Sequence, residues 1–292
     1  MTLSSLIKST VKKTPPLLYL KNKVFSYIRR EYWHEAQISE VLKIFAPFSG
    51  NPPSLVTKLT LLSANSTFPL LEKLMVNISN KSLLKVVIAE QFFQTDETRI
   101  VSESLSELFM KYGSDKSKTH NYQLIYGPIL MNPEKITKIL EIGMGTNNTD
   151  VVSNMGVNGK PGASLRAFRD FLPNAVIFGA DFDKRILFSE DRIQTYFVDQ
   201  TNLSTFEELG KNVGTGFDLI IDDALHAPNA NLAVLLFAMD RLKPNGWLII
   251  EDIREEAIPL WQVVAQLLPL QWKSHVVAAK GASYVFAVQK RN

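Results

Sequence analysis

The sequence predicts an α/β protein in which a helical segment precedes a largely parallel sheet that ends in an antiparallel hairpin. After Pro133, short β-rich runs alternate with runs of helical periodicity, a pattern typical of parallel strands joined by crossover helices. The last two runs, 273–279 and 283–290, lie only three residues apart, which is too short for a crossover and predicts a hairpin. Earlier in the chain, apolar residues recur at helical spacing. We therefore expect a helical N-terminal domain over 1–110 and an α/β domain over 111–292.

The predicted elements follow one another in a simple order. Helical periodicity starts near Lys21 and is interrupted at "APFSGNPPS" and "SANSTFP", where Pro, Gly and Ser cluster. Helices this short are marginal alone, so we expect the α/β domain or another subunit of a homo-oligomer to cover them. Five parallel strands follow, in "KILEIGMG", "AVIFGADFD", "IQTYFVDQ", "FDLIIDD" and "WLIIEDI". Five such units closed by a hairpin are the plan of class I methyltransferases, whereas dinucleotide-binding folds normally end in another parallel strand.

Composition excludes several classes of protein. The 292 residues are 46% hydrophobic, which is ample for a core, and include no cysteine, so a metal would need oxygen or imidazole ligands. No apolar run is long enough to span a bilayer, and the N-terminus lacks the apolar core of a signal peptide, so we expect a soluble, cytoplasmic protein. A net charge of +3 gives no reason to expect nucleic-acid binding.

Glycines and acids stand at the ends of the first predicted strands. "ILEIGMG" runs into Gly143 and Gly145, where missing side chains let a ligand approach the backbone. Asp181 is placed to accept hydrogen bonds from ribose hydroxyls, and Asp199 is placed near an adenine edge, because ligands of open α/β sheets bind at these strand ends. Each residue alone could be a turn glycine or a strand-terminating acid, but three signals in this order favour an adenosyl ligand.

A long loop separates Gly145 from the next predicted helix, "ASLRAFRDFL". A dinucleotide site would begin its helix at once to receive a pyrophosphate. S-adenosylmethionine has no phosphate, and its sulfonium and amino acid portion suit an acidic, glycine-lined pocket. Glu141 could anchor its amino group, directly or through water. The residues expected to contact this cofactor are Glu141, Gly143, Gly145, Ser164, Asp181, Asp199, Gln200 and Asp222.

Carboxylates gather at the ends of two later strands, "FDLIIDD" and "WLIIEDI". Neighbouring strands lie roughly 4.8 Å apart, so these acids would crowd together and repel one another unless a cation such as Mg²⁺ neutralised them. One objection is that adjacent residues of a strand point to opposite faces. Glu251 and Asp252 can both be ligands only if the strand has curled into a loop there.

His226 follows this acid cluster, three residues after Asp223. A lone histidine in a loop that enters a helix is more often a capping or solvated residue. The predicted metal cluster beside it favours a general base, a role that suits the near-neutral pKa of imidazole.

Several motifs together resemble a known family. "YGSDKSKTHNY", "LEIGMG", "GASLRAF", "IDDALH" and "IIEDI" are similar to the metal-dependent sugar O-methyltransferases of macrolide biosynthesis, the mycinamicin type, and to cephalosporin hydroxylase-like proteins, over about 110–290. The resemblance implies Mg²⁺ ligands at Asp223, Glu251 and Asp252, and a base at His226.

The chain departs from the family pattern in two places. Ala224 and Leu225 stand where D-D-G-S-H is common, and Ser114 replaces the threonine of G-T-D-K. Both departures leave the charged residues intact. The resemblance places the stretch around Lys116, His120 and Tyr122 over the cofactor or the substrate, without individual roles.

The expected reaction is Mg²⁺-dependent methyl transfer from S-adenosylmethionine to a hydroxyl of a sugar-containing small molecule or glycan. Three alternatives stay open: a metal-independent small-molecule methyltransferase, a non-catalytic adenosyl-ligand subunit of a polysaccharide or natural-product assembly complex, and an NAD-dependent oxidoreductase. The acid cluster opposes the first, the complete set of metal ligands opposes the second, and the hairpin and the long loop oppose the third.

Overall fold

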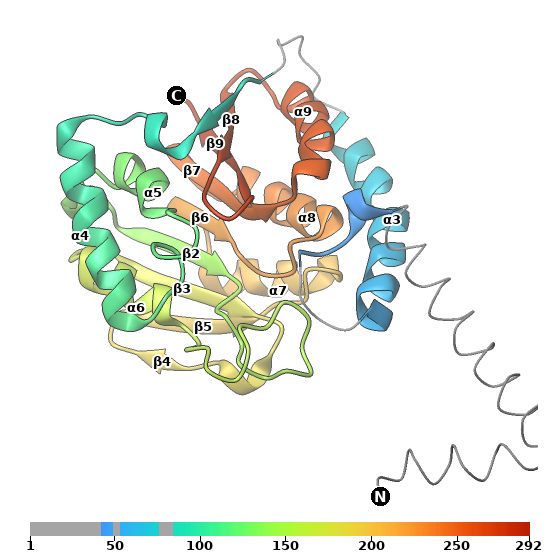
Figure 1. Cartoon of the computed structure of the whole chain (residues 1–292), viewed down its shortest axis with the longest axis horizontal. Helices are drawn as coiled ribbons and strands as arrows, with labels where there is room; N and C mark the ends of the chain where they lie inside the picture. The colour runs from blue at the N-terminus through green and yellow to red at the C-terminus, as the bar shows by residue number, and fades with distance from the viewer. Residues whose placement is uncertain (1–41, 49–52, 76–83) are drawn as a thin grey trace, which may run out of the picture.

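The computed structural model describes residues 42–48, 53–75 and 84–292, and its centre is a nine-stranded sheet (Figure 1). The strands run in the order β1-β8-β9-β7-β6-β2-β3-β5-β4. Their bounds are β1 (Val86–Ile88), β2 (Lys138–Ile142), β3 (Val176–Asp181), β4 (Ser189–Glu190), β5 (Ile193–Phe197), β6 (Phe217–Asp222), β7 (Leu242–Ile253), β8 (Trp272–Ala278) and β9 (Tyr284–Lys290).

The central pairings confirm the predicted strand plan. The five predicted strands, β2, β3, β5, β6 and β7, pair in parallel, and β8 and β9 form the antiparallel hairpin. Two short strands were not predicted. β4 pairs antiparallel with β5, and β1 pairs in parallel with β8 at the opposite edge.

Alternate residues of each central strand face two different hydrophobic layers. On β2, for example, Ile139 packs into one cluster and Leu140 into the other. The first layer contains residues of α4 (Asp96–Tyr112), α5 (Gln123–Ile129) and α6 (Ala163–Phe171), and the second contains residues of α7 (Leu203–Val213), α8 (Pro228–Met239) and α9 (Ile258–Leu267).

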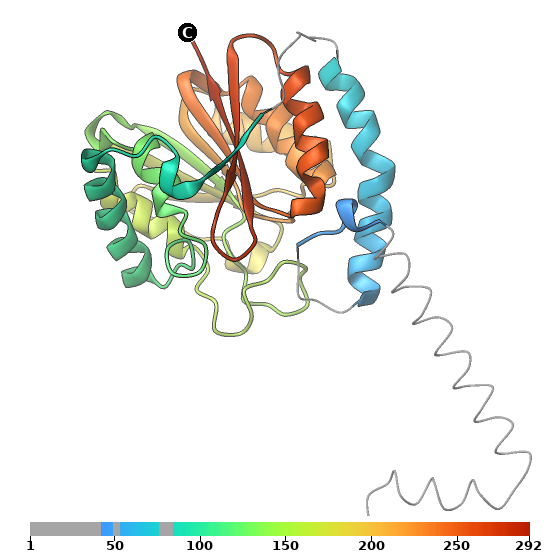
Figure 2. The same ribbon diagram turned by 45° about the horizontal axis from the view of Figure 1, so that its top comes forward.

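The remaining long helix, α3 (Pro53–Met75), lies outside this second layer and packs on α8 and α9 (Figures 1 and 2). The sequence of α8, "PNANLAVLLFAM", is apolar all round, and nearly all its residues are buried. A helix of that kind needs cover on every side. Because the sheet covers one side of α8, α3 provides cover on another.

The predicted break at 63–69 is wrong, since α3 continues through it. Two hydroxyls in this helix are satisfied by its own carbonyls: Thr60 Oγ1 donates to Val56 O and Thr67 Oγ1 to Ser63 O, both at 2.7 Å. Packing on α8 therefore overrides the low helix propensity of a serine- and threonine-rich segment.

The predicted boundary at residue 110 stays a prediction. Within the described residues, β1 and α4 contact the α/β fold, because β1 pairs with β8 and α4 packs on α6. The helices predicted for 21–41 lie outside the described residues. Among the helices that are described, none combines the length and apolarity needed to cross a bilayer.

Candidate active site

Two adjoining cavities, each of about 390 Å³, lie at the carboxyl ends of the parallel strands. We call the first the glycine cavity, because it contains Gly143 and Gly145 together with Asp181, Asp199 and Gln200. We call the second the acid cavity; it is lined by Phe48, Asp115, His120, Gly145, Ser153, Asn154, Met155, Asp223, His226, Asp252 and Arg254. The two cavities share Gly145, Ser153 and Asp223, so they meet there.

Both cavity glycines have left-handed backbone conformations, with φ of +93° at Gly143 and +76° at Gly145. A Cβ on Gly143 would lie 2.2 Å from the backbone oxygen of Asp223. This glycine therefore allows the chain after β2 to lie against the loop after β6, and it also lines the glycine cavity. A Cβ on Gly145 would meet the flexible side chain of Met155 instead.

Asp181 is fixed by the backbone at the end of β3. Its Oδ2 accepts from Met144 N and its Oδ1 from Asp183 N, both at 2.8 Å. Burial raises the pKa of this carboxyl. Asp199, also in the glycine cavity, accepts from the backbone N and Oγ1 of Thr201. Each carboxylate has further lone pairs, so both can still accept hydrogen bonds from a ligand.

Gln200 and Asp222 mainly support the loop after β6. Gln200 Nε2 donates to Asp222 Oδ1 at 2.6 Å, and Gln200 Oε1 accepts from Leu225 N at 2.9 Å. Asp222 also accepts from Asn231 and is fully buried. Burial raises the pKa of Asp222 to about 6. Asp222 does not line the glycine cavity, whereas Gln200 does.

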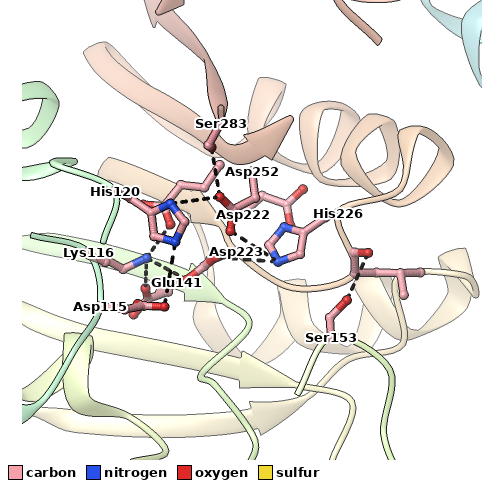
Figure 3. Close-up of polar contacts among 12 residues, drawn as sticks. Asp115, Lys116, His120, Glu141, Ser153, Asp222, Asp223, His226, Asp252 and Ser283 are labelled. Atoms are coloured by element: carbon pink, nitrogen blue, oxygen red, sulfur yellow. Dashed lines mark hydrogen bonds and ion pairs between the residues drawn. The ribbon is translucent and has the colours of Figure 1, made fainter. Parts of the chain in front are cut away.

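A buried lysine connects the ends of β2, β6 and β7 (Figure 3). Lys116 Nζ lies 2.7 Å from Asp223 Oδ2, 2.5 Å from Glu251 Oε2 and 3.2 Å from Glu141 Oε1. The Lys116 side chain is 2% exposed. Burial lowers the pKa of its ammonium, but the three carboxylates outweigh burial and raise this pKa well above its ordinary value. Glu141 also accepts from Ser164 Oγ at 2.5 Å.

The end of β7 carries a bulge at Glu251 and Asp252. Ile250 pairs with Phe286 and Ile253 with Tyr284, so β7 advances three residues while β9 advances two. Asp252 has φ of +53° within this bulge. The strand is therefore irregular at these two acids but continues to Ile253, so it has not curled into a loop there.

Despite the bulge, Glu251 and Asp252 face different partners. Glu251 accepts from Lys116 and from the hydroxyl of Tyr126, and burial raises its pKa well above the ordinary value. Asp252 Oδ1 accepts from the hydroxyl of Tyr122 at 2.5 Å. Burial raises the pKa of Asp252, but the nearby His226 and a second histidine outweigh it, so this pKa is lowered.

Asp223, His226 and Asp252 form a group of potential metal ligands, with ligand atoms within 4.8 Å of one another. His226 Nε2 lies 3.8 Å from Asp223 Oδ1 and 3.8 Å from Asp252 Oδ2. Its buried Nδ1 has no hydrogen-bond partner within the described residues. His120 lies on the other side of Asp252, with its Nδ1 at 3.7 Å from Asp252 Oδ1 (Figure 3).

The structure thus brings Asp223, Asp252 and His226 together as a cluster. Glu251 is connected to this cluster only through Lys116, which pairs with both Glu251 and Asp223. The contacts of Lys116 and Tyr126 were not predicted from sequence. The motif "YGSDKSKTHNY" contains Lys116 but does not indicate its role. Its partners Asp223 and Glu251 lie 107 and 135 positions further along the chain, and no sequence pattern connects residues so far apart.

Comparisons with known proteins agree with these motifs. No protein-family model matches the sequence. In Streptomyces olivaceus, 8-demethyl-8-alpha-L-rhamnosyl tetracenomycin-C 2'-O-methyltransferase is 24% identical over 159 residues, which cover 54% of this chain and 40% of that protein. The matched part of the chain is similar to O-methyltransferases.

Two further relatives are each 32% identical over 93 residues, which cover 32% of this chain and 23% of theirs. They are mycinamicin VI 2''-O-methyltransferase of Micromonospora griseorubida and demethylmacrocin O-methyltransferase of Streptomyces fradiae. The chain thus spans less than half the length of the curated relatives that it matches. A solved structure of the MycE methyltransferase in complex with Mg, SAH and mycinamycin VI is 25% identical with a TM-score of 0.43, covering 51% of this chain and 37% of that chain.

Proposed function

We propose that this protein transfers a methyl group from S-adenosylmethionine to a hydroxyl of a sugar-containing acceptor, with Mg²⁺ as cofactor. The observation that carries the proposal is the junction of the two cavities at Asp223. A glycine-lined cavity for a methyl donor thereby opens onto a cavity lined by acids and histidines, where an acceptor hydroxyl can lose its proton.

The glycine cavity suits an adenosyl ligand without phosphate. Among the described residues that line it, Lys58 is the one cation, while Asp150, Asp181, Asp199 and Asp223 are acids. A pyrophosphate would be repelled by such a lining, whereas ribose hydroxyls can donate to Asp181 and Asp199. When bound, S-adenosylmethionine supplies an electrophilic methyl group on its sulfonium.

The acid cavity suits a hard divalent cation. Asp223 and Asp252 offer carboxylate oxygens, the donor type that Mg²⁺ prefers. Bound Mg²⁺ would lower the pKa of a coordinated hydroxyl. Glu251 is the third ligand in our proposal, and it must then turn away from Lys116 and Tyr126.

We assign His226 as the base. It borders the acid cavity beside Asp223 and Asp252, so a hydroxyl held there can pass its proton to the imidazole. The acceptor oxygen would bond to the methyl carbon as the carbon–sulfur bond breaks. Lys116 keeps Glu141 and Asp223 in place during this step.

The class of acceptor follows from the lining and from the relatives. Polar side chains dominate the acid cavity. Phe48 adds an aromatic ring, and the guanidinium carbon of Arg254 lies over this ring, 5.2 Å from its centre. The names of the relatives describe methylation of rhamnosyl and macrolide acceptors. A sugar hydroxyl therefore fits best.

Calorimetry tests the proposed cofactor. S-adenosylhomocysteine should bind and NAD should not. Asp181→Ala should weaken binding by about 0.5–3 kcal/mol, because hydrogen bonds to the ribose are lost. Asp191→Ala is the control, since this acid lies between β4 and β5, does not line the glycine cavity and has a side chain that is 89% exposed. Binding of NAD together with no binding of S-adenosylhomocysteine would refute the proposal.

A further inference from the structure

Helix α3 presents two different faces to the rest of the protein. One stripe consists of small hydroxyl residues, Thr57, Thr60, Ser63 and Thr67, all of which are buried. Residues at this spacing share one side of a helix, so α3 has one buried side along these four residues.

A second stripe on α3 is apolar and borders the glycine cavity. Leu55, Leu59 and Leu62 follow the i, i+4, i+7 spacing of one helix face, and all three line the cavity. Leu55 and Leu62 are each 41% exposed, so they leave apolar surface uncovered beside the glycine cavity. Exposed apolar side chains next to a cavity are a feature of ligand sites.

The position of this stripe is set by the fold. The apolar helix α8 begins just after the loop of Ala224 and Leu225, which also lines the glycine cavity. Because α3 packs on α8, its leucines line the same cavity as Asp181 and Phe182 at the end of β3. Phe182 is itself 56% exposed, so the segment that follows β3 also offers apolar surface to the cavity.

We propose that α3 forms an added wall of the cofactor site, in which Leu55, Leu59 and Leu62 cover the adenosyl group. The inference rests on the proposed function, because it takes the ligand of the glycine cavity to be S-adenosylmethionine. The wall lies outside the part of the chain, 110–290, whose motifs resemble the sugar O-methyltransferases. It supplies affinity by removing water from the ligand and carries no part of the chemistry.

Calorimetry with S-adenosylhomocysteine tests the wall in the full chain. The double variant Leu55→Ala/Leu62→Ala should bind about 5- to 30-fold more weakly, the loss expected when part of two leucine contacts is removed. Leu61→Ala is a matched control, since Leu61 is 42% exposed on the same helix but does not line the cavity. Its affinity should stay within about twofold of wild type.

Melting curves without ligand show whether each variant folds, and the single variants Leu55→Ala and Leu62→Ala replace the double if it does not. Unchanged affinity in the cavity-facing variants, while wild type binds, would overturn the wall but leave the proposed function intact. An equal loss in Leu61→Ala would also overturn it, because the effect would then be general. No binding by wild type would instead refute the proposed function.

Discussion

At the scale of single residues, Lys116 changes how the acid cluster is understood. Four strand-end carboxylates would repel one another, which is why a cation was predicted from the sequence. In the structure, the ammonium of Lys116 already neutralises part of this charge, through Asp223, Glu251 and Glu141. The folded protein therefore does not depend on Mg²⁺ alone to hold its acids together. We expect Mg²⁺ to complete a cluster that Lys116 has ordered.

Lys116→Met tests this role. The variant leaves three carboxylates without their buried cation, and we expect it to lose about 3–5 kcal/mol of unfolding free energy in EDTA. Mg²⁺ should raise its melting temperature more than that of wild type, because the ion then replaces the missing charge. Lys118→Met is the control, as Lys118 is exposed on the same loop. Equal stability of Lys116→Met and wild type in EDTA would disprove the role.

At the scale of elements, the strands and turns that depend on local sequence patterns were predicted. The five parallel strands and the hairpin follow from β-rich runs and a three-residue connection. β1 was missed because a strand of three residues carries no periodicity and is defined by its pairing with β8. The continuation of α3 through 63–69 was missed because it depends on packing against α8.

The hairpin strand β8 contains a pH-sensitive residue that lies away from the site. Burial of the imidazole is the main cause that lowers the pKa of His275 to about 4, and the positive charges of Lys273 and Arg291 lower it further. The unfolded chain then binds a proton at higher pH than the folded one, so stability should fall as the pH drops from about 6.5 to about 4. We expect a loss of about 1–2 kcal/mol, less than full burial would give, because the ring keeps some solvent contact.

His275→Phe should remove that part of the pH dependence. Phenylalanine keeps a ring beside Phe92 and Phe93, whose centres lie 5.5 and 5.2 Å from the imidazole. Denaturant melts at several pH values compare the two proteins. Parallel stability curves for wild type and variant between pH 4 and 6.5 would show that His275 does not titrate as described.

At the scale of the whole molecule, the candidate site is assembled from distant parts of the chain. Asp223 directly follows β6 and Asp252 lies near the end of the neighbouring β7, a proximity that could be predicted from the sequence. Lys116 comes from the loop after α4, and the leucines of α3 come from a segment without any recognisable motif. Such contacts depend on tertiary packing and could not be predicted from spacing. The acids at the strand ends were therefore easier to predict from the sequence than the residues that pack around them.

The central claim is that Asp223, Glu251 and Asp252 hold a divalent cation while His226 acts as base. Titration with Mn²⁺, followed by electron paramagnetic resonance, tests it without a known acceptor. Wild type should bind one ion, and Asp252→Asn should bind it at least about 10-fold more weakly. His226→Ala should keep its Mn²⁺ affinity within about threefold of wild type, because the proposed base is not a metal ligand. Asp115→Asn should do the same, because it removes a charge from the acid cavity but not from the ligand cluster. Unchanged Mn²⁺ affinity in Asp252→Asn, or its loss in His226→Ala, would contradict the account.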